Sequence, residues 1–163
     1  MPKFDAPFTS EIMRVEPSFI DYNGHMNVAY YVVLFDRFLD VVFERLGLGE
    51  SYLKEQQHSF FAAEMHINYR RELKLGAPVR TTFRLIDHDE KRLHFYQEMF
   101  HAEEGYLACA AENLSLHVDM RSRKVAPFLP GPLDVLRALM AAHSVLPPPD
   151  FSGRKISLRK PGT

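Results

Sequence analysis

Residues 21–46 read Asp21-Tyr22-Asn23-Gly24-His25-Met26-Asn27 and then VAYYVVLFDRFLDVVFERL, a polar turn that leads directly into a long apolar run. Of the nineteen residues in this run, the charged or strongly polar ones are Asp36, Arg37, Asp40, Glu44 and Arg45. At about 100° per residue, the first four lie in a stripe roughly 100° wide, which predicts a helix with most of its circumference buried. Gly47 predicts the end of that helix.

A membrane span is the competing interpretation of this run. Five charged residues argue against it, as does the lack of an uninterrupted apolar stretch of about 18 residues. We therefore expect a buried core helix about 28 Å long, around which the rest of the chain must fold.

Four segments after the helix show the alternation of apolar and polar residues that is typical of strands. They are residues 59–71, 78–87, 92–101 and 106–118, with turns at 88–91 and 102–105 and a connector at 75–78. Residues 9–15 are expected to form one strand before the helix, and residues 50–56 a short helical or loop segment. The predicted order is strand, helix and four antiparallel strands.

The C-terminal region predicts one more helix and a tail. Pro132 opens an amphipathic helix that runs to about Val145, and the triple proline at 147–149 ends it. We expect a single domain over residues 1–146 and a Pro-rich, basic tail over residues 147–163 that is ordered in part. A chain of 163 residues can bury roughly 70 % of its unfolded surface, so one domain is sufficient.

Composition excludes several classes of function. The net charge of −1 provides no basic field for nucleic acid. The single cysteine, Cys109, cannot form an internal disulfide and is expected to be a small core residue. The eight histidines show no His-Glu-x-x-His grouping, so we expect no metal site. The N-terminus has no signal-peptide pattern, which favours the cytoplasm and no membrane partner.

The polar turn is the best candidate for chemistry. A carboxylate beside a helix start can act as a base or a nucleophile, and the free N–H groups of the first turn can hold an oxyanion. A purely structural interpretation is also open. In that interpretation Asp21 or Asn23 opens a turn, Gly24 supplies an unusual backbone angle and Asn27 caps the helix.

These motifs resemble those of the hotdog-fold acyl-CoA thioesterases, particularly the 4-hydroxybenzoyl-CoA thioesterase-like group, over about residues 10–127. The matching residues are Asp21-x-x-Gly24-His25-x-Asn27 and, later, Ile67-Asn68-Tyr69 with Leu73 and Gly76. More narrowly, residues 85–118, with Asp89-Glu90-Lys91-Arg92-Leu93 and Leu116-His117-Val118-Asp119, resemble thioesterases associated with carnitine dehydrogenases. Those enzymes are assigned to betainyl-CoA and related substrates.

The resemblance implies an α+β hotdog fold, in which an antiparallel sheet wraps around the long central helix. It also implies a homodimer or a dimer of dimers, paired edge to edge, with active sites at the interface. Exposed sheet edges in so small a domain favour pairing on physical grounds as well.

The resemblance further implies catalytic roles at the matching positions. Asp21 is the catalytic carboxylate, which either attacks the thioester carbon or activates water. The N–H at Val28 binds the thioester oxygen, and Gly24 lets the backbone approach closely. His25 and Asn27 are candidates for positioning water or the acyl group.

Binding of the substrate is expected to involve a second set of residues. The phosphates of coenzyme A call for Lys and Arg, and the candidates are Lys91 with Arg92 and Arg121 with Arg123. Each pair is equally consistent with an ordinary solvated turn. A trimethylammonium acyl group would need an aromatic face, for which Tyr69 is a candidate.

The sequence therefore predicts hydrolysis of an acyl-CoA thioester, such as betainyl-CoA or a related short acyl-CoA, without a cofactor. Two alternatives remain open. One is a noncatalytic acyl-CoA-binding module, because fold does not determine function. The other is an acyl-CoA hydratase that uses Asp21 and His25, although hydratases of this fold typically place four residues between Asp and His and this chain has three.

Overall fold

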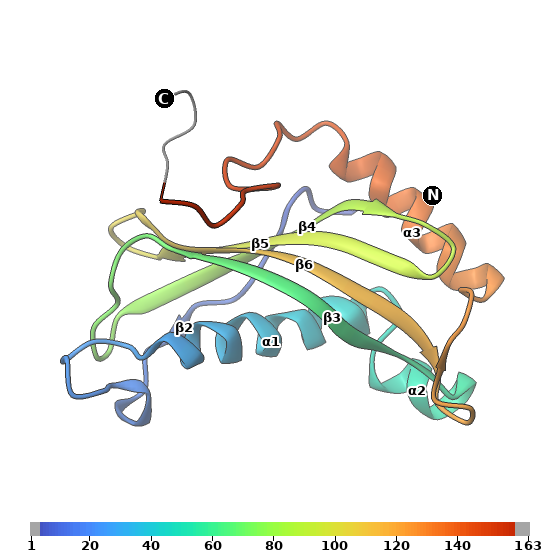
Figure 1. Cartoon of the computed structure of the whole chain (residues 1–163), viewed down its shortest axis with the longest axis horizontal. Helices are drawn as coiled ribbons and strands as arrows, with labels where there is room; N and C mark the ends of the chain where they lie inside the picture. The colour runs from blue at the N-terminus through green and yellow to red at the C-terminus, as the bar shows by residue number, and fades with distance from the viewer. Residues whose placement is uncertain (1–3, 159–163) are drawn as a thin grey trace.

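The computed structural model describes residues 4–158 of the chain. One curved antiparallel sheet lies between two layers, with α1 and α2 on one side and α3 with the C-terminal segment on the other (Figure 1). The helices are η1 (Pro17–Phe19), α1 (Val28–Arg45), α2 (Glu50–Gln56) and α3 (Pro130–His143). The strands are β1 (Phe8–Thr9), β2 (Met13–Arg14), β3 (His58–Tyr69), β4 (Pro78–His88), β5 (Arg92–His101), β6 (Leu107–Asp119) and β7 (Lys124–Val125).

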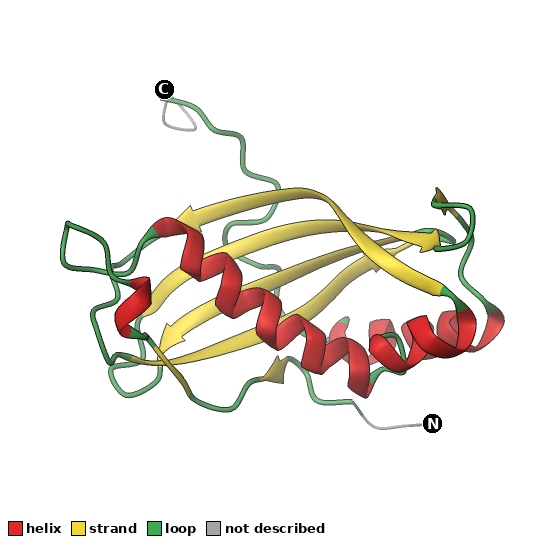
Figure 2. Ribbon diagram, turned by 90° about the horizontal axis from the view of Figure 1, so that it is seen from below, coloured by secondary structure: helices red, strands yellow, loops and turns green. Residues whose placement is uncertain are grey.

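The sheet has the order β1-β4-β5-β6-β3, with β2 also paired to β4 and β7 paired to β6. All these pairings are antiparallel. The expected hotdog arrangement, a sheet around a long helix, is confirmed, and Figure 2 shows α1 crossing the sheet. The long strand β3 lies at one edge, and only β6 pairs with it.

The structure differs from the predicted elements most clearly at the N-terminal strand, at the start of α3 and at β7. The structure has two short strands in place of the single strand expected over residues 9–15. The strand is interrupted at Ser10, because there the side-chain hydroxyl, and not a backbone carbonyl, accepts the hydrogen bond from the Thr81 N–H at 3.0 Å. Helix α3 begins at Pro130, two residues before the predicted Pro132, since Pro is favoured in the first turn. Strand β7 was not predicted.

Helix α1 packs one side against the sheet and leaves the other open. Its buried residues are Tyr31, Leu34, Phe35, Phe38, Val42 and Phe43. Val28 and Val41 are 56 % and 44 % exposed, so within one chain the expectation that most of the circumference is buried is wrong. The physical reason is that the sheet ends at β3 and does not curl fully around the helix.

Two further sequence expectations can be compared with the structure. Cys109 is fully buried, which confirms it as a core residue, and burial raises the pKa of its thiol to about 12. Within residues 4–158, no helix combines the length and apolar composition needed to cross a bilayer.

The described part of the C-terminal tail lies along the outer face of the sheet (Figure 1). Glu112 of β6 accepts hydrogen bonds from Ser152 Oγ at 2.7 Å and from the Gly153 N–H at 2.6 Å. Arg84 of β4 donates to the Leu146 carbonyl at 2.9 Å. The tail is therefore docked up to Gly153, and residues 159–163 of the predicted tail lie outside the described residues.

Candidate active site

The polar turn before α1 is a closed loop. An isolated bridge joins Ile20 to Met26, and the Gly24 N–H donates to the Asp21 carbonyl at 3.0 Å. Gly24 has φ +77°, a region that favours glycine. No heavy atom of the protein lies within 4 Å of the position that a Cβ would take, so the positive φ of the turn is the feature of the chain that favours glycine here.

Asn27 links this loop to the helix. Its side-chain oxygen accepts from the Ala29 N–H at 3.1 Å, which makes it the N-cap of α1. Its side-chain amide donates to Asp21 Oδ2 at 3.1 Å. The same side chain therefore caps α1 and holds the Asp21 carboxylate.

Asp21 is held as a carboxylate. Its Oδ1 accepts from the Asn23 N–H at 2.8 Å, and that bond is the main reason why the pKa of Asp21 is below its ordinary value. Burial opposes this effect as the second-largest influence on the pKa, and the Asn27 amide and the nearby His25 lower the pKa further. An ionised carboxylate is suited to act as a base or a nucleophile and not as a proton donor.

His25 lies in the same turn but does not bond the carboxylate. Its Nδ1 is 3.1 Å from the Met26 carbonyl and donates to it. The imidazole is partly exposed, so its Nε2 is available to a bound molecule.

The first turn of α1 completes this group of residues. Val28 is the first residue of the helix, so its N–H has no acceptor within the helix. The Tyr69 hydroxyl, from the end of β3, donates to the Val28 carbonyl at 3.1 Å. The structure therefore brings together Asp21, Gly24, His25, Asn27, Val28 and Tyr69.

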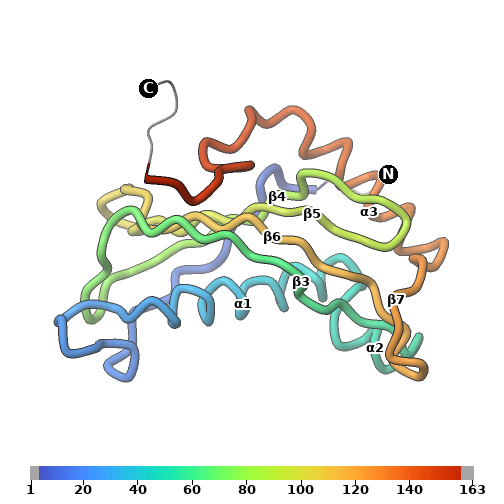
Figure 3. Tube along the Cα trace, in the orientation of Figure 1, coloured from blue at the N-terminus to red at the C-terminus, as the bar shows by residue number. Residues whose placement is uncertain are grey.

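The four predicted basic residues lie elsewhere in the chain. Arg121 and Arg123 are in the turn between β6 and β7, next to α2 and at the end of the molecule opposite the polar turn (Figure 3). Lys91 and Arg92 are in the β4–β5 hairpin, where Arg92 pairs with Leu116. A single chain does not bring either pair to Asp21.

Three of these cations are already paired with acids. Arg92 Nε is 2.6 Å from Asp89 Oδ2, and Lys91 Nζ is 3.3 Å from Glu90. Arg121 Nε is 3.5 Å from Asp119. The Arg123 guanidinium instead lies 5.2 Å from the centre of the Phe61 ring.

A cavity of about 670 Å³ lies between α1, α2 and β3. Its walls include the acids Asp36, Asp40, Glu44 and Glu50 and the rings of Phe43 and Phe60. Burial and the neighbouring Asp36 raise the pKa of Asp40, and within residues 4–158 neither aspartate forms an ion pair. The sequence places both on the polar stripe of the helix, four residues apart, which is the spacing of two neighbours on a helix surface. Arg37 of the same stripe pairs instead with Glu16, at 2.7 Å.

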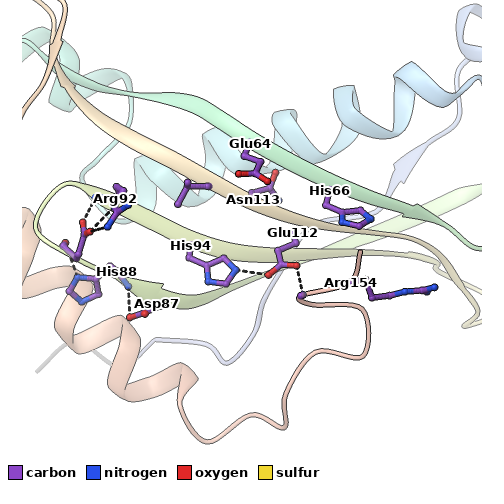
Figure 4. A pocket seen from close by; sticks show the side chains of 12 residues that line it. Glu64, His66, Asp87, His88, Arg92, His94, Glu112, Asn113 and Arg154 are labelled. Carbon is purple, nitrogen blue, oxygen red and sulfur yellow. Dashed lines mark hydrogen bonds and ion pairs between the residues drawn. The ribbon is translucent and has the colours of Figure 1, made fainter. Parts of the chain in front are cut away.

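A second cavity, of about 530 Å³, lies on the outer face of the sheet (Figure 4). Here His94 Nε2 is 2.7 Å from Glu112 Oε1, and Glu64 and His66 of β3 face the same space. Asp21 lines neither cavity. The turn at Asp21 is therefore an open surface within one chain.

Known proteins share both the sequence and this fold. The Thioesterase-like superfamily matches residues 15–139. A "Betainyl-CoA thioesterase" of Pseudomonas aeruginosa is 35 % identical, over 88 % of this chain and 91 % of its own length. A bifunctional "L-carnitine dehydrogenase/betainyl-CoA thioesterase" of Rhizobium meliloti is 33 % identical over 90 % of this chain, which spans only 29 % of that protein.

The fold is also found among solved structures. A hypothetical protein of Staphylococcus aureus in complex with CoA has a TM-score of 0.87 and 26 % identity, over 94 % of this chain and 96 % of its own. The family match covers all of α1, the strands from β3 to β7 and the turn at Asp21. The chain therefore belongs to the thioesterase-like superfamily and is a thioesterase of the hotdog fold.

Proposed function

We propose that this protein is a cytoplasmic acyl-CoA thioesterase with Asp21 as its catalytic carboxylate, and that its substrate is betainyl-CoA or a related short acyl-CoA. The observation that carries the proposal is the ionised Asp21 side chain, which two hydrogen bonds hold beside the first turn of α1. The related Pseudomonas aeruginosa thioesterase supports the choice of acyl group.

Asp21 can act in two ways. As a base it takes a proton from water, the hydroxide oxygen bonds to the thioester carbon, and the carbon–sulfur bond breaks. The proton on Asp21 then passes to the departing thiolate, which gives free acid and coenzyme A. As a nucleophile, the carboxylate itself displaces the thiolate and forms an anhydride, which water then hydrolyses.

The first turn of α1 would stabilise the charge that develops on the thioester oxygen. The Val28 N–H points out of the helix start, where the helix dipole also favours negative charge. Asn27 keeps the carboxylate of Asp21 next to this turn. The free Nε2 of His25 would position water or the acyl group.

The active unit in this proposal is a homodimer, alone or within a dimer of dimers. Strand β3 is an edge strand of twelve residues, and Phe61 and Met65 on it are each 39 % exposed. Such an edge is stable only when it is paired or covered. Antiparallel pairing of two β3 strands would place Tyr69 of one chain beside the first β3 residues of the other.

That pairing would also bring the basic residues that are predicted to bind coenzyme A to the active site. His58, the first residue of β3, pairs with Asp119, next to Arg121 and Arg123. In the dimer, this end of one chain would lie beside Asp21 of the other. The four basic residues, which are far from Asp21 in one chain, would then face the phosphates of its substrate.

The acyl group would extend into the cavity between α1, α2 and β3 of the second chain. Betaine carries a quaternary ammonium group, for which carboxylates and aromatic rings are the favourable surroundings. Asp36 and Asp40 provide unpaired negative charge, and Phe43 and Phe60 provide rings whose centres are 4.9 Å apart. These residues support a cationic acyl group over a neutral one.

Thiol release from a panel of acyl-CoA esters tests the proposal. The panel would contain betainyl, benzoyl, and short and medium aliphatic esters. We expect turnover to be highest with betainyl-CoA and to fall by at least about 10²-fold in Asp21→Asn. Asp134→Asn, an exposed carboxylate on α3, is the matched control and should retain activity.

Two results would replace the proposal with the alternatives. Binding of esters without thiol release from any of them would indicate a noncatalytic acyl-CoA-binding module. Addition of water to an enoyl-CoA without thiol release would indicate a hydratase that uses Asp21 and His25.

A further inference from the structure

Tyr69 contacts the helix start from the far end of β3. Its hydroxyl donates to the Val28 carbonyl at 3.1 Å. Its ring meets the ring of Tyr31 edge-on, with 5.2 Å between centres and 82° between planes. Because Val28 and Tyr31 are three residues apart on α1, both contacts hold the same side of the first turn.

The connection that follows β3 holds the loop before the helix. The Leu73 carbonyl accepts from the Met26 N–H at 2.8 Å, and Leu73 is fully buried. On the other side, the Asn27 N–H donates to the Phe19 carbonyl at 2.9 Å, and the Phe19 and Tyr30 rings stack at 4.5 Å. The backbone from Met26 to Tyr31 is therefore held by contacts from β3, from Leu73 and from η1.

Among these contacts, the Tyr69 hydroxyl is the one that reaches the backbone of Val28 itself. In an α-helix the Val28 carbonyl also accepts from the residue four positions later, so the tyrosine is a second donor to that oxygen. Its removal would leave the helix intact but free the first turn to move. A misplacement of about 1 Å at a catalytic group can reduce the rate by about 10²-fold.

We propose that Tyr69 is a positioning residue, whose hydroxyl sets the first turn of α1 so that the Val28 N–H meets the thioester oxygen. This inference rests on the proposed function of that N–H. It assigns the hydroxyl of Tyr69 a different role from the predicted contact of its aromatic face with a trimethylammonium acyl group. The ring, which is 47 % exposed, remains accessible to substrate.

Tyr69→Phe removes the hydroxyl and keeps the ring against Tyr31. We expect kcat to fall by about five- to tenfold, the rate equivalent of one neutral hydrogen bond, with KM unchanged within about twofold. Hydrogen exchange at the Ala29 and Tyr30 amides, which donate to the side chain and the carbonyl of Asn27, should be faster in this variant, while exchange in the rest of α1 stays as in the wild type.

Tyr106→Phe is the matched control. The Tyr106 hydroxyl also donates to a backbone carbonyl, but that carbonyl belongs to Glu72, at 3.0 Å, which lies outside α1. This variant should lose a similar, small amount of thermal stability and keep wild-type kcat, KM and exchange at Ala29 and Tyr30.

Three results would overturn the positioning role. A rise in KM with unchanged kcat in Tyr69→Phe would make Tyr69 a substrate contact. Equal losses of kcat in both variants would indicate a general effect on stability, and unchanged exchange at Ala29 and Tyr30 would show that the hydroxyl does not hold the turn. If the wild type releases no thiol from any ester, the proposed function fails, and the exchange measurement still decides whether Tyr69 holds the turn.

Discussion

At the scale of single residues, Asn27 connects stability to the proposed chemistry. One end of its side chain caps α1 and the other end holds the Asp21 carboxylate. Because the two ends have different chemistry, substitutions can separate the two roles.

Asn27→Ala should remove both the N-cap of α1 and the hydrogen bond to Asp21, whereas Asn27→Ser should remove only the hydrogen bond to Asp21. The alanine variant removes the cap, so its free energy of unfolding should fall by about 1 kcal/mol, whereas serine is a good N-cap and should retain it. Both variants remove the amide that lowers the pKa of Asp21. The acid limb of the pH–rate profile should therefore move to higher pH in both, because the carboxyl becomes easier to protonate.

Chemical denaturation and pH–rate profiles would measure these two effects. An acid limb that stays in place in both variants would contradict the link between Asn27 and Asp21. If activity falls in proportion to the free energy of unfolding in every variant, Asn27 acts only as the N-cap of α1.

Asp40 is the residue to change for selectivity among acyl groups. Its carboxylate lines the cavity between α1, α2 and β3 and has no ion-pair partner within residues 4–158. Asp40→Asn should raise KM for betainyl-CoA by on the order of tenfold, the scale of a partly screened charge pair, and leave KM for acetyl-CoA unchanged.

Steady-state kinetics with the two esters gives the comparison, with Asp134→Asn as a charge-matched control on the exposed surface of α3. An equal change of KM for both esters would remove Asp40 from any role in recognising a cation.

At the scale of secondary-structure elements, a buried histidine pair joins α2, β3 and β6. The His117 and His58 rings stack with 5.0 Å between centres. His117 Nδ1 donates to the Ala126 carbonyl at 2.8 Å, so its Nε2 accepts from the Tyr52 hydroxyl at 2.9 Å. This arrangement requires a neutral imidazole.

The pair makes the fold sensitive to acid. Burial, and to a lesser extent His58, lowers the pKa of His117 below its ordinary value. The unfolded chain therefore binds a proton at a higher pH than the folded chain, and stability is lost as the pH falls below about 6.5. Each unit of difference in pKa corresponds to about 1.4 kcal/mol.

Urea denaturation at pH 7.5 and pH 5.5 would test this expectation. His117→Gln, which has no titrating ring, should lose less stability between the two pH values than the wild type. His88→Gln, in a partly exposed position, should behave like the wild type. An equal pH dependence in all three proteins would place the acid sensitivity elsewhere, for example at the buried His143.

At the scale of the whole molecule, the proposed active site depends on the free edge of β3. The turn at Asp21, the acidic cavity and the basic residues lie at different places in one chain. Antiparallel pairing of β3 with a second β3 is the arrangement that would bring them together. Assembly and activity should therefore be lost together.

Met65→Arg should separate the dimer into monomers and abolish thiol release. Met65 lies on the β3 edge and is 39 % exposed, so a single chain can accept the substitution without unfolding. Ile12→Arg is the control, since Ile12 is similarly exposed at 49 % but lies between β1 and β2, far from that edge. Sedimentation velocity and the thiol assay would measure both variants, and a fully active monomer would contradict the proposal.

The order of elements and the composition of the turn at Asp21 could be predicted from the sequence, because both depend on local patterns. Apolar spacing along residues 28–46 defines α1, alternation defines the long strands, and an Asn before an apolar run predicts an N-cap. The hydrogen bond from Asn27 to Asp21 was not among these predictions, because it depends on how the loop between the two residues closes.

The tertiary structure alone decided which distant residues meet. The order of the strands places β3 at the edge of the sheet and the basic residues at the end of the molecule far from Asp21. It also places the Tyr69 hydroxyl within hydrogen-bond distance of the Val28 carbonyl. The tertiary structure also places the C-terminal tail in contact with Glu112, and Asp36 and Asp40 in the wall of a cavity. These outcomes depend on contacts between residues far apart in sequence, which periodicity and capping rules do not encode.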